Sequence, residues 1–141
     1  MNKIQFNYLA PVPELKNKTQ LKTFLITMAK AEAKRIDEIR YIFCSDKYLL
    51  NINRQFLNHD YFTDIISFEM NLPKEPINGE IYISIDRVRD NARKLGESVR
   101  NELYRVIFHG MLHFCGFKDK LKKDYKQMKL KEDFYLKRYN A

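Results

Sequence analysis

Two histidines and one aspartate stand at a spacing that suits a single metal ion. His109 and His113 lie four residues apart in an apolar run that predicts a helix, so both imidazoles project from one face about one turn apart. Gly116 can adopt a positive φ and end that helix, after which the chain can bring the Asp119 carboxylate toward the same ion. Two neutral imidazoles and one carboxylate leave a coordination position open, as catalytic zinc sites do. We therefore predict one zinc ion (Zn2+) per chain, held by His109, His113 and Asp119, with a metal-bound water as a catalytic group.

The simpler alternative is a pair of helix histidines with no ligand role, since pairs at this spacing arise by chance in many helices. Two of the three histidines of the chain, however, fall in its most apolar stretch, where imidazoles without partners would be costly to bury. The residue after the first histidine is also informative. Gly110 offers no proton acceptor where the H-E-x-x-H proteases carry a glutamate base, which disfavours a peptidase.

Composition bounds the class of protein. The chain has 141 residues, of which 45% are hydrophobic, enough for one domain over residues 1–141 with its own core. The apolar runs are shorter than the roughly 20 residues of a membrane span, and no secretory signal is readable at the start. Only Cys44 and Cys115 are present, both expected in the core, so a disulfide framework is not expected. We expect a soluble, cytoplasmic protein with no membrane partner.

The charge distribution suggests a polyanionic partner. The formal net charge is +8, and an acidic stretch over residues 61–86 is flanked by basic segments, the last of them rich in lysine. Lys122, Lys123 and Lys126 are the candidates in that segment for contact with RNA phosphates. A solvated helix face and a basic surface that only favours solubility are the plain alternatives.

The hydrophobic pattern predicts an α/β (or α+β) domain. We expect a small four-stranded mixed sheet packed with about five helices, with the metal site on a central helix. Strands are predicted at about residues 4–8, 39–44, 64–70 and 80–85, and helices at about 17–35, 48–56, 86–96, 98–115 and 121–139. Asp46 and Ser98 are the expected N-caps of the second and fourth helices, and Gly96 and Gly116 the expected helix stops.

Several segments together resemble the YbeY endoribonucleases, metalloproteins of bacterial ribosomal RNA maturation. The family signature H-G-x-L-H-x-x-G-Y-D-H is similar to residues 109–119, which begin His-Gly-Met-Leu-His and end Phe-Lys-Asp. The family pattern L-N-x-x-Y-R-x-x-D-x-P-T-D-V-L-S-F looks like residues 52–68, with Asp60, Thr63, Asp64, Ser67 and Phe68 matching. A G-D-I-x-I strand resembles residues 79–84, and an E-L-x-R segment resembles residues 102–105.

Two departures from the family pattern bear on the site. The third metal histidine of the signature is Asp119 here, which is an acceptable hard ligand for zinc. The family arginine after the aromatic residue is Leu57, which removes a cation suited to phosphate. Arg105, one turn before His109, is our candidate replacement as a catalytic residue, with Arg54 as a further RNA-binding candidate, although Arg105 could equally form only an ion pair with Glu102. Asp64 is a weaker candidate for orienting a ligand, and His59 is expected in a loop outside the site.

The resemblance implies a zinc-dependent endoribonuclease specific for single strands. Its expected role is maturation of ribosomal RNA, at the 3′ end of the small-subunit RNA, and ribosome quality control, with single-stranded RNA and the ribosome as partners. Two alternatives stay open. One is a zinc metallopeptidase-like amide hydrolase, which would need an acidic base from another segment. The other is a non-catalytic RNA-binding ribosome assembly factor in which zinc only fixes the last helix.

Overall fold

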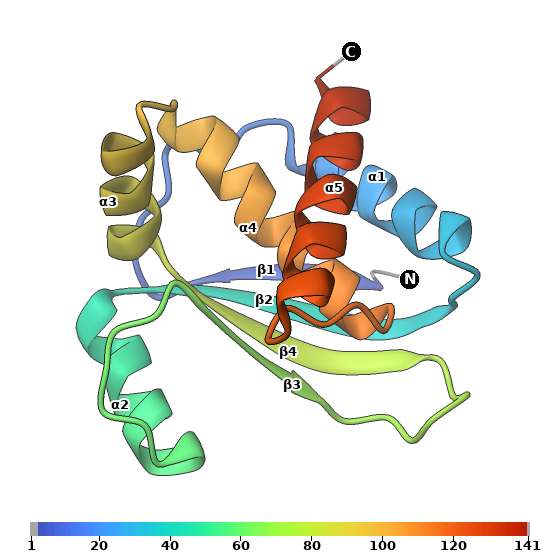
Figure 1. Ribbon diagram of the computed structural model, residues 1–141, viewed down its shortest axis with the longest axis horizontal. Helices are drawn as coiled ribbons and strands as arrows, with labels where there is room; N and C mark the ends of the chain where they lie inside the picture. Colours follow the sequence, from blue (N-terminus) through green and yellow to red (C-terminus); the bar gives the residue numbers. More distant parts are fainter. Residues whose placement is uncertain (1–2, 141) are drawn as a thin grey trace.

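Four strands form one mixed sheet, and five helices pack around it (Figure 1). The structure is a computed structural model that describes residues 3–140. Its elements in chain order are β1 (Ile4–Tyr8), α1 (Lys18–Ala31), β2 (Ile36–Cys44), α2 (Asp46–Leu57), β3 (Ile65–Glu69), β4 (Ile77–Ser84), α3 (Ile85–Leu95), α4 (Val99–Phe114) and α5 (Lys122–Tyr139). The spatial order is β1-β2-β4-β3, with β1, β2 and β4 parallel and β3 antiparallel to β4. The predicted α/β class, the four-stranded mixed sheet and the five helices are confirmed.

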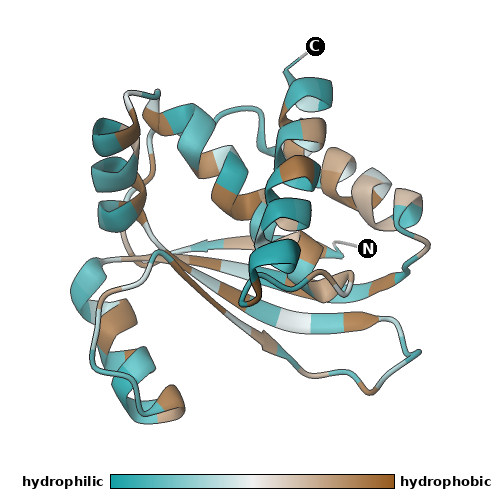
Figure 2. Cartoon of the chain, viewed as in Figure 1, coloured by the Kyte–Doolittle hydropathy of each residue, from teal (hydrophilic) through white to brown (hydrophobic). Residues whose placement is uncertain are grey.

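The helices cover the two faces of the sheet unequally. In Figure 1, α1, α3, α4 and α5 lie on one side of the sheet and α2 lies on the other. The main core is between the four helices and the sheet, while Cys44, Leu49, Ile52 and Ile66 form a small second core under α2. Figure 2 shows apolar residues concentrated in the strands and on α4, with α3 and α5 largely hydrophilic. Among the described helices, none is both long and apolar enough to cross a membrane.

The central helix α4 is held firmly against the sheet. The Tyr41 hydroxyl of β2 donates a hydrogen bond of 2.9 Å to the Ile107 carbonyl in the buried interior. A Cβ at Gly110 would lie 3.0 Å from side-chain atoms of Ile81, so the glycine permits a close approach of α4 to β4. With this side of α4 committed to the sheet, His109 and His113 remain on its half-buried side.

Some predicted boundaries were wrong in detail. Ser45, and not Asp46, caps α2, because its hydroxyl accepts a hydrogen bond of 3.2 Å from the Tyr48 amide. The Asp46 carboxylate accepts instead from the Ser84 hydroxyl at 2.6 Å and from Arg87. The first helix ends at Ala31, since Ala33 has a φ of 60° and a right-handed helix cannot continue through it.

Other predicted details are confirmed. The Ser98 hydroxyl caps α4 by accepting from the Asn101 amide at 3.0 Å. Gly96 and Gly116 have positive φ values of 67° and 102° and lie just after α3 and α4, as expected for helix stops. Cys44 and Cys115 are buried free thiols.

Candidate metal centre

The C-terminal half of α4 and the loop after it bring three ligand groups together. The Asp119 Oδ2 atom lies 3.1 Å from His109 Nε2 and 3.2 Å from His113 Nε2. The potential ligand atoms of the three residues all lie within 4.8 Å of one another. The turn at Gly116 reverses the chain, which is the local reason why a residue six positions after His113 returns to its imidazole. The sequence prediction placed the same three residues together.

The donor set fits a divalent cation. For ligand bonds of about 2.1 Å, two ligand atoms of a tetrahedral site are about 3.4 Å apart, close to the separations found here. Burial lowers the pKa of His113, which favours the neutral imidazole that binds metal. Two imidazole nitrogens facing one carboxylate need a proton or a cation between them, and a metal ion meets that need.

A buried glutamate that the sequence reasoning missed completes the centre. Glu132 of α5 is 7% exposed, and its Oε2 lies 2.6 Å from His109 Nδ1. Because a carboxylate accepts the hydrogen bond from Nδ1–H, the neutral form of this imidazole has its Nε2 lone pair free for a metal ion. The signal in the sequence was an acid at a core position, because Met128, Glu132, Tyr135 and Leu136 form the buried stripe of an otherwise exposed, basic helix.

Arg105 is held by several carboxylates. Its Nη1 donates to Glu132 Oε1 at 3.2 Å and to Asp133 Oδ1 at 2.8 Å, and its Nε lies 3.8 Å from Glu102. The arginine therefore fixes Glu132, which in turn fixes His109. Its proposed action on an RNA phosphate stays a prediction, since these ion pairs also give it a positioning role.

The metal centre opens into a pocket between α4, α5 and the start of β3. Its wall also contains residues with hydroxyl and carboxyl groups. It is lined by Thr63, Asp64, Ile65, Ser67, Leu95, Glu102, Arg105, Val106, His109, His113, Asp119, Tyr125, Met128, Lys129 and Glu132. Burial raises the pKa of Asp64 above its usual range, partly offset by the charge of His109. Asp64, expected near the site, thus lies in the same pocket as the ligands.

Glu102 is a second buried carboxyl group on helix α4 in the wall of this pocket. It is 4% exposed, and its Oε1 has no hydrogen-bond partner among residues 3–140. Burial, with the nearby charge of Asp64, raises the pKa of Glu102 to about 7. The carboxyl group is thus partly protonated at neutral pH.

A stability measurement tests this assignment. The pKa of Glu102 is higher in the folded protein than in the unfolded chain, so as the pH rises the unfolded chain loses this proton first. The contribution of Glu102 to the unfolding free energy therefore falls between about pH 4.5 and 7. Glu102→Gln removes that ionisation. We expect the variant to exceed the parent in unfolding free energy by about 1–3 kcal/mol at pH 8 and by little at pH 5, measured by urea denaturation. Equal gains at both pH values would show that Glu102 is not titrating in this range.

The remaining predicted residues lie outside the metal pocket. Arg54 is on α2 and pairs with Asp60 in the loop that follows. Lys122, Lys123 and Lys126 are exposed in the first turns of α5, next to the loop that carries Asp119. Leu57, which stands where the family pattern has an arginine, is 40% exposed at the end of α2, and its apolar side chain supplies no positive charge there. His59 is a loop residue whose Nδ1 lies 3.0 Å from the Tyr61 hydroxyl, as its exclusion from the site anticipated.

Comparisons with known proteins agree on one family. A family model described as Endoribonuclease YbeY matches residues 5–140. A protein named Endoribonuclease YbeY from Cytophaga hutchinsonii is 51% identical over 120 residues, covering 85% of this chain and 84% of the relative. One of the same name from Flavobacterium psychrophilum is 47% identical over 138 residues, covering 98% and 97%. The solution structure of TM1509 from Thermotoga maritima superposes with a TM-score of 0.64 at 27% identity, covering 95% of this chain and 88% of that one.

Proposed function

The chain belongs to the YbeY endoribonuclease family and is a nuclease hydrolase, and on that premise we propose that it is a zinc-dependent endoribonuclease that cuts single-stranded RNA. The proposal includes a single catalytic domain over residues 1–141 and a cytoplasmic location. It also includes a role in maturing the 3′ end of small-subunit ribosomal RNA and in ribosome quality control, with the ribosome as a partner. The observation that carries the proposal is the convergence of His109, His113 and Asp119 in a pocket beside the buried Glu132.

We propose that His109, His113 and Asp119 hold the metal. Zinc in such a site supplies a Lewis acid for a phosphoryl oxygen and acidifies water. Glu132 keeps the proton of His109 on Nδ1 and so holds the ring in its metal-binding tautomer. Arg105 lines the pocket, and we propose that it stabilises negative charge on the RNA phosphate. Its ion pair with Glu132 keeps that glutamate in place.

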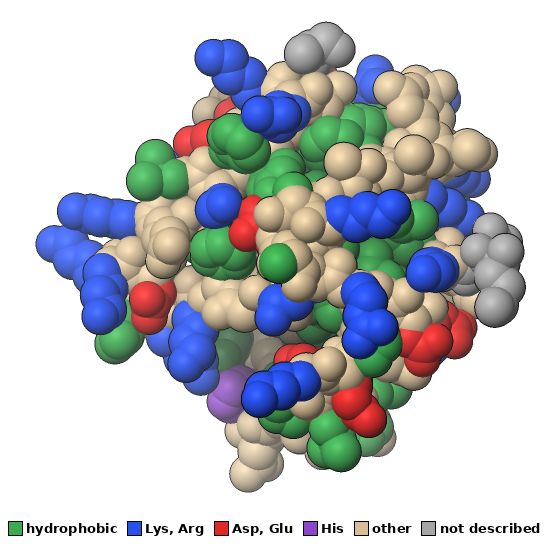
Figure 3. Space-filling view, turned by 90° about the vertical axis from the view of Figure 1, so that its right-hand side faces the viewer, with side chains coloured by type: hydrophobic (Ala, Val, Ile, Leu, Met, Phe, Trp, Pro, Cys, Tyr) green, Lys and Arg blue, Asp and Glu red, His purple; other side chains and the backbone are tan. Residues whose placement is uncertain are grey.

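Basic side chains favour an RNA partner. The face in Figure 3 carries many more Lys and Arg side chains than Asp and Glu side chains. Lys122, Lys123 and Lys126 lie close in sequence to the ligand Asp119, and we propose that they bring RNA phosphates toward the pocket by electrostatic attraction. Arg54 is a more distant candidate for the same contact. The surface charge supports this RNA path over the amide hydrolase, which has no need of it.

The test is a cleavage assay with controlled metal content. Purified protein is incubated with a labelled single-stranded RNA oligomer and with the same sequence as a duplex. We expect cleavage of the single strand, loss of cleavage after chelation, and recovery on addition of zinc. Cleavage that persists after the metal has been removed, as verified by elemental analysis, would overturn the metal dependence, and absence of cleavage under all conditions would overturn the activity.

A further inference from the structure

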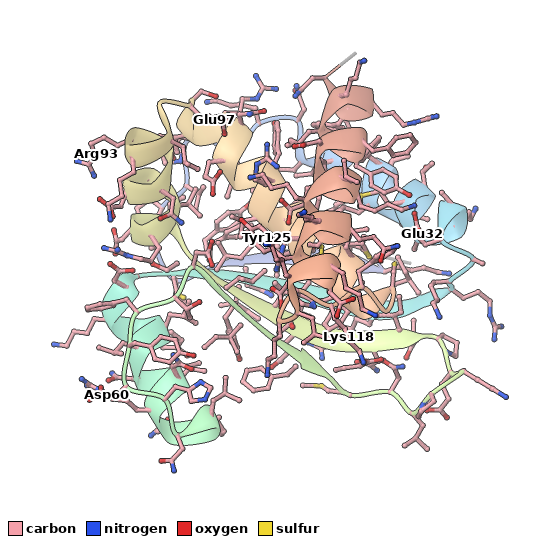
Figure 4. The ribbon with its side chains drawn as sticks, viewed as in Figure 1. Glu32, Asp60, Arg93, Glu97, Lys118 and Tyr125 are labelled. Atoms are coloured by element: carbon pink, nitrogen blue, oxygen red, sulfur yellow. The ribbon has the colours of Figure 1, made fainter. Side chains whose placement is uncertain are left out.

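The mouth of the metal pocket carries an aromatic ring that the fold does not use. Tyr125 lines the pocket and is 56% exposed. Its ring has no stacking partner and its hydroxyl has no side-chain hydrogen bond within the described part of the chain, residues 3–140. Tyr61, which is 55% exposed, stacks instead on His59 at a centroid distance of 5.1 Å. Figure 4 places Tyr125 near the start of α5, on the side toward α4.

One turn further along α5, the same pocket wall carries a cation. Lys129 follows Tyr125 by four residues, about 6 Å along the helix axis, and its side chain is exposed. No ion pair of Lys129 is found among the described residues. The other cation of the pocket wall, Arg105, is committed to Glu132 and Asp133.

The charge of the pocket makes this lysine important for an anionic substrate. Its wall contains the carboxyl groups of Asp64, Glu102, Asp119 and Glu132. Each of these groups that is ionised and not balanced by the metal ion disfavours an approaching phosphate, and a cation at the mouth offsets that charge. Lys129 is placed to do so, and Tyr125 beside it offers a flat apolar surface to an unpaired base.

We propose that Tyr125 and Lys129 form a nucleotide subsite of the pocket, in which the ring stacks on one base of single-stranded RNA and the ammonium group binds a neighbouring phosphate. The proposal rests on the proposed function, because it takes RNA as the substrate. Stacking on an aromatic side chain requires an unpaired base, so this subsite accounts for a preference for single strands over duplexes.

The test uses chelator-treated protein, so that RNA is bound without being cut. The probes are two fluorescently labelled single-stranded RNA oligomers of equal length, one of adenosines and one with abasic riboses, followed by fluorescence anisotropy. Tyr125→Ala is expected to weaken binding of the adenosine oligomer about 5- to 150-fold. It should leave the abasic oligomer unchanged, because that probe has no base to stack. Tyr125→Phe should bind both probes as the parent does.

Lys129→Ala has a different expected signature. It should weaken both oligomers and lower the slope of log affinity against log salt by about 0.7, the value for one lost phosphate contact. Tyr61→Ala and Lys137→Ala are the matched controls, since both residues are exposed and outside the pocket wall. Both should bind as the parent does.

Three results would overturn the subsite: unchanged binding of the adenosine oligomer by Tyr125→Ala, an equal loss for both oligomers, or an equal loss in Tyr125→Phe. The outcome is separable from that of the cleavage assay. A protein that cuts single-stranded RNA with zinc but shows no effect of Tyr125→Ala keeps the proposed function and loses this subsite. A protein that fails to cut RNA but shows the stacking signature loses the proposed function and keeps the subsite.

Discussion

Replacing His113 with alanine is expected to reduce bound zinc from about one equivalent per chain to near zero, and cleavage of single-stranded RNA by at least about 100-fold. In the proposed site His113 supplies one of three protein ligands, and its Nε2 lies 3.2 Å from the Asp119 carboxylate. Two ligands do not hold zinc tightly in water. Metal content is measured by elemental analysis after dialysis, and cleavage by gel electrophoresis of the labelled oligomer.

His59→Ala is the matched control for this change. His59 is the remaining histidine of the chain, and its imidazole lies against Tyr61 outside the pocket. We expect the His59 variant to keep both zinc and activity, with both variants shown to be folded by circular dichroism. A His113→Ala protein that keeps a full equivalent of zinc would remove His113 from the ligand set.

Asp119→His should retain zinc, because it substitutes one nitrogen ligand for one oxygen ligand, whereas Asp119→Ala should not.

The second large effect is expected at Glu132. Glu132→Gln is expected to weaken zinc binding about 10- to 100-fold, measured by competition with a chelator of known affinity. Glutamine preserves the shape of the side chain but gives up the charge that holds the Nδ1 proton of His109, 2.6 Å away. The metal then binds a less basic imidazole in a less well fixed orientation. Activity at saturating zinc should be affected less than zinc affinity, which marks Glu132 as a positioning residue and not a catalytic one.

The variant Asp133→Asn tests whether Glu132 acts through its hydrogen bond to His109 or through its ion pair with Arg105. Asp133 is the neighbouring residue, its side chain is 55% exposed, and it bonds to Arg105 but makes no contact with a ligand histidine. We expect its zinc affinity to stay within about threefold of the parent, as for other exposed ion pairs. Equal losses in the two variants would mean that Glu132 acts only through Arg105.

The clustering of His109, His113 and Asp119 could be predicted because it depends on local geometry. Helical periodicity places His109 and His113 on one face, and a glycine stop allows the chain to return within a few residues to deliver Asp119. The class of the fold was predictable for a similar reason, since the spacing of apolar residues reports strands and helices one segment at a time. The errors fell at boundaries, such as the cap at Ser45, where two adjacent polar residues compete for one position.

The surroundings of the metal were decided by tertiary structure. Glu132 reaches His109 across 23 positions of sequence, Arg105 reaches Asp133 across 28, and the pocket wall combines β3, α3, α4 and α5. No local rule gives the angle at which α5 crosses α4, because it results from how the buried side chains of the two helices pack. That packing brings Glu132 of the lysine-rich helix α5 against His109. It also places Tyr125 and Lys129 at the mouth of the pocket. The sequence alone determined that His109, His113 and Asp119 come together, because they share one helix and the turn that ends it, while only the packing of α5 decided what surrounds them.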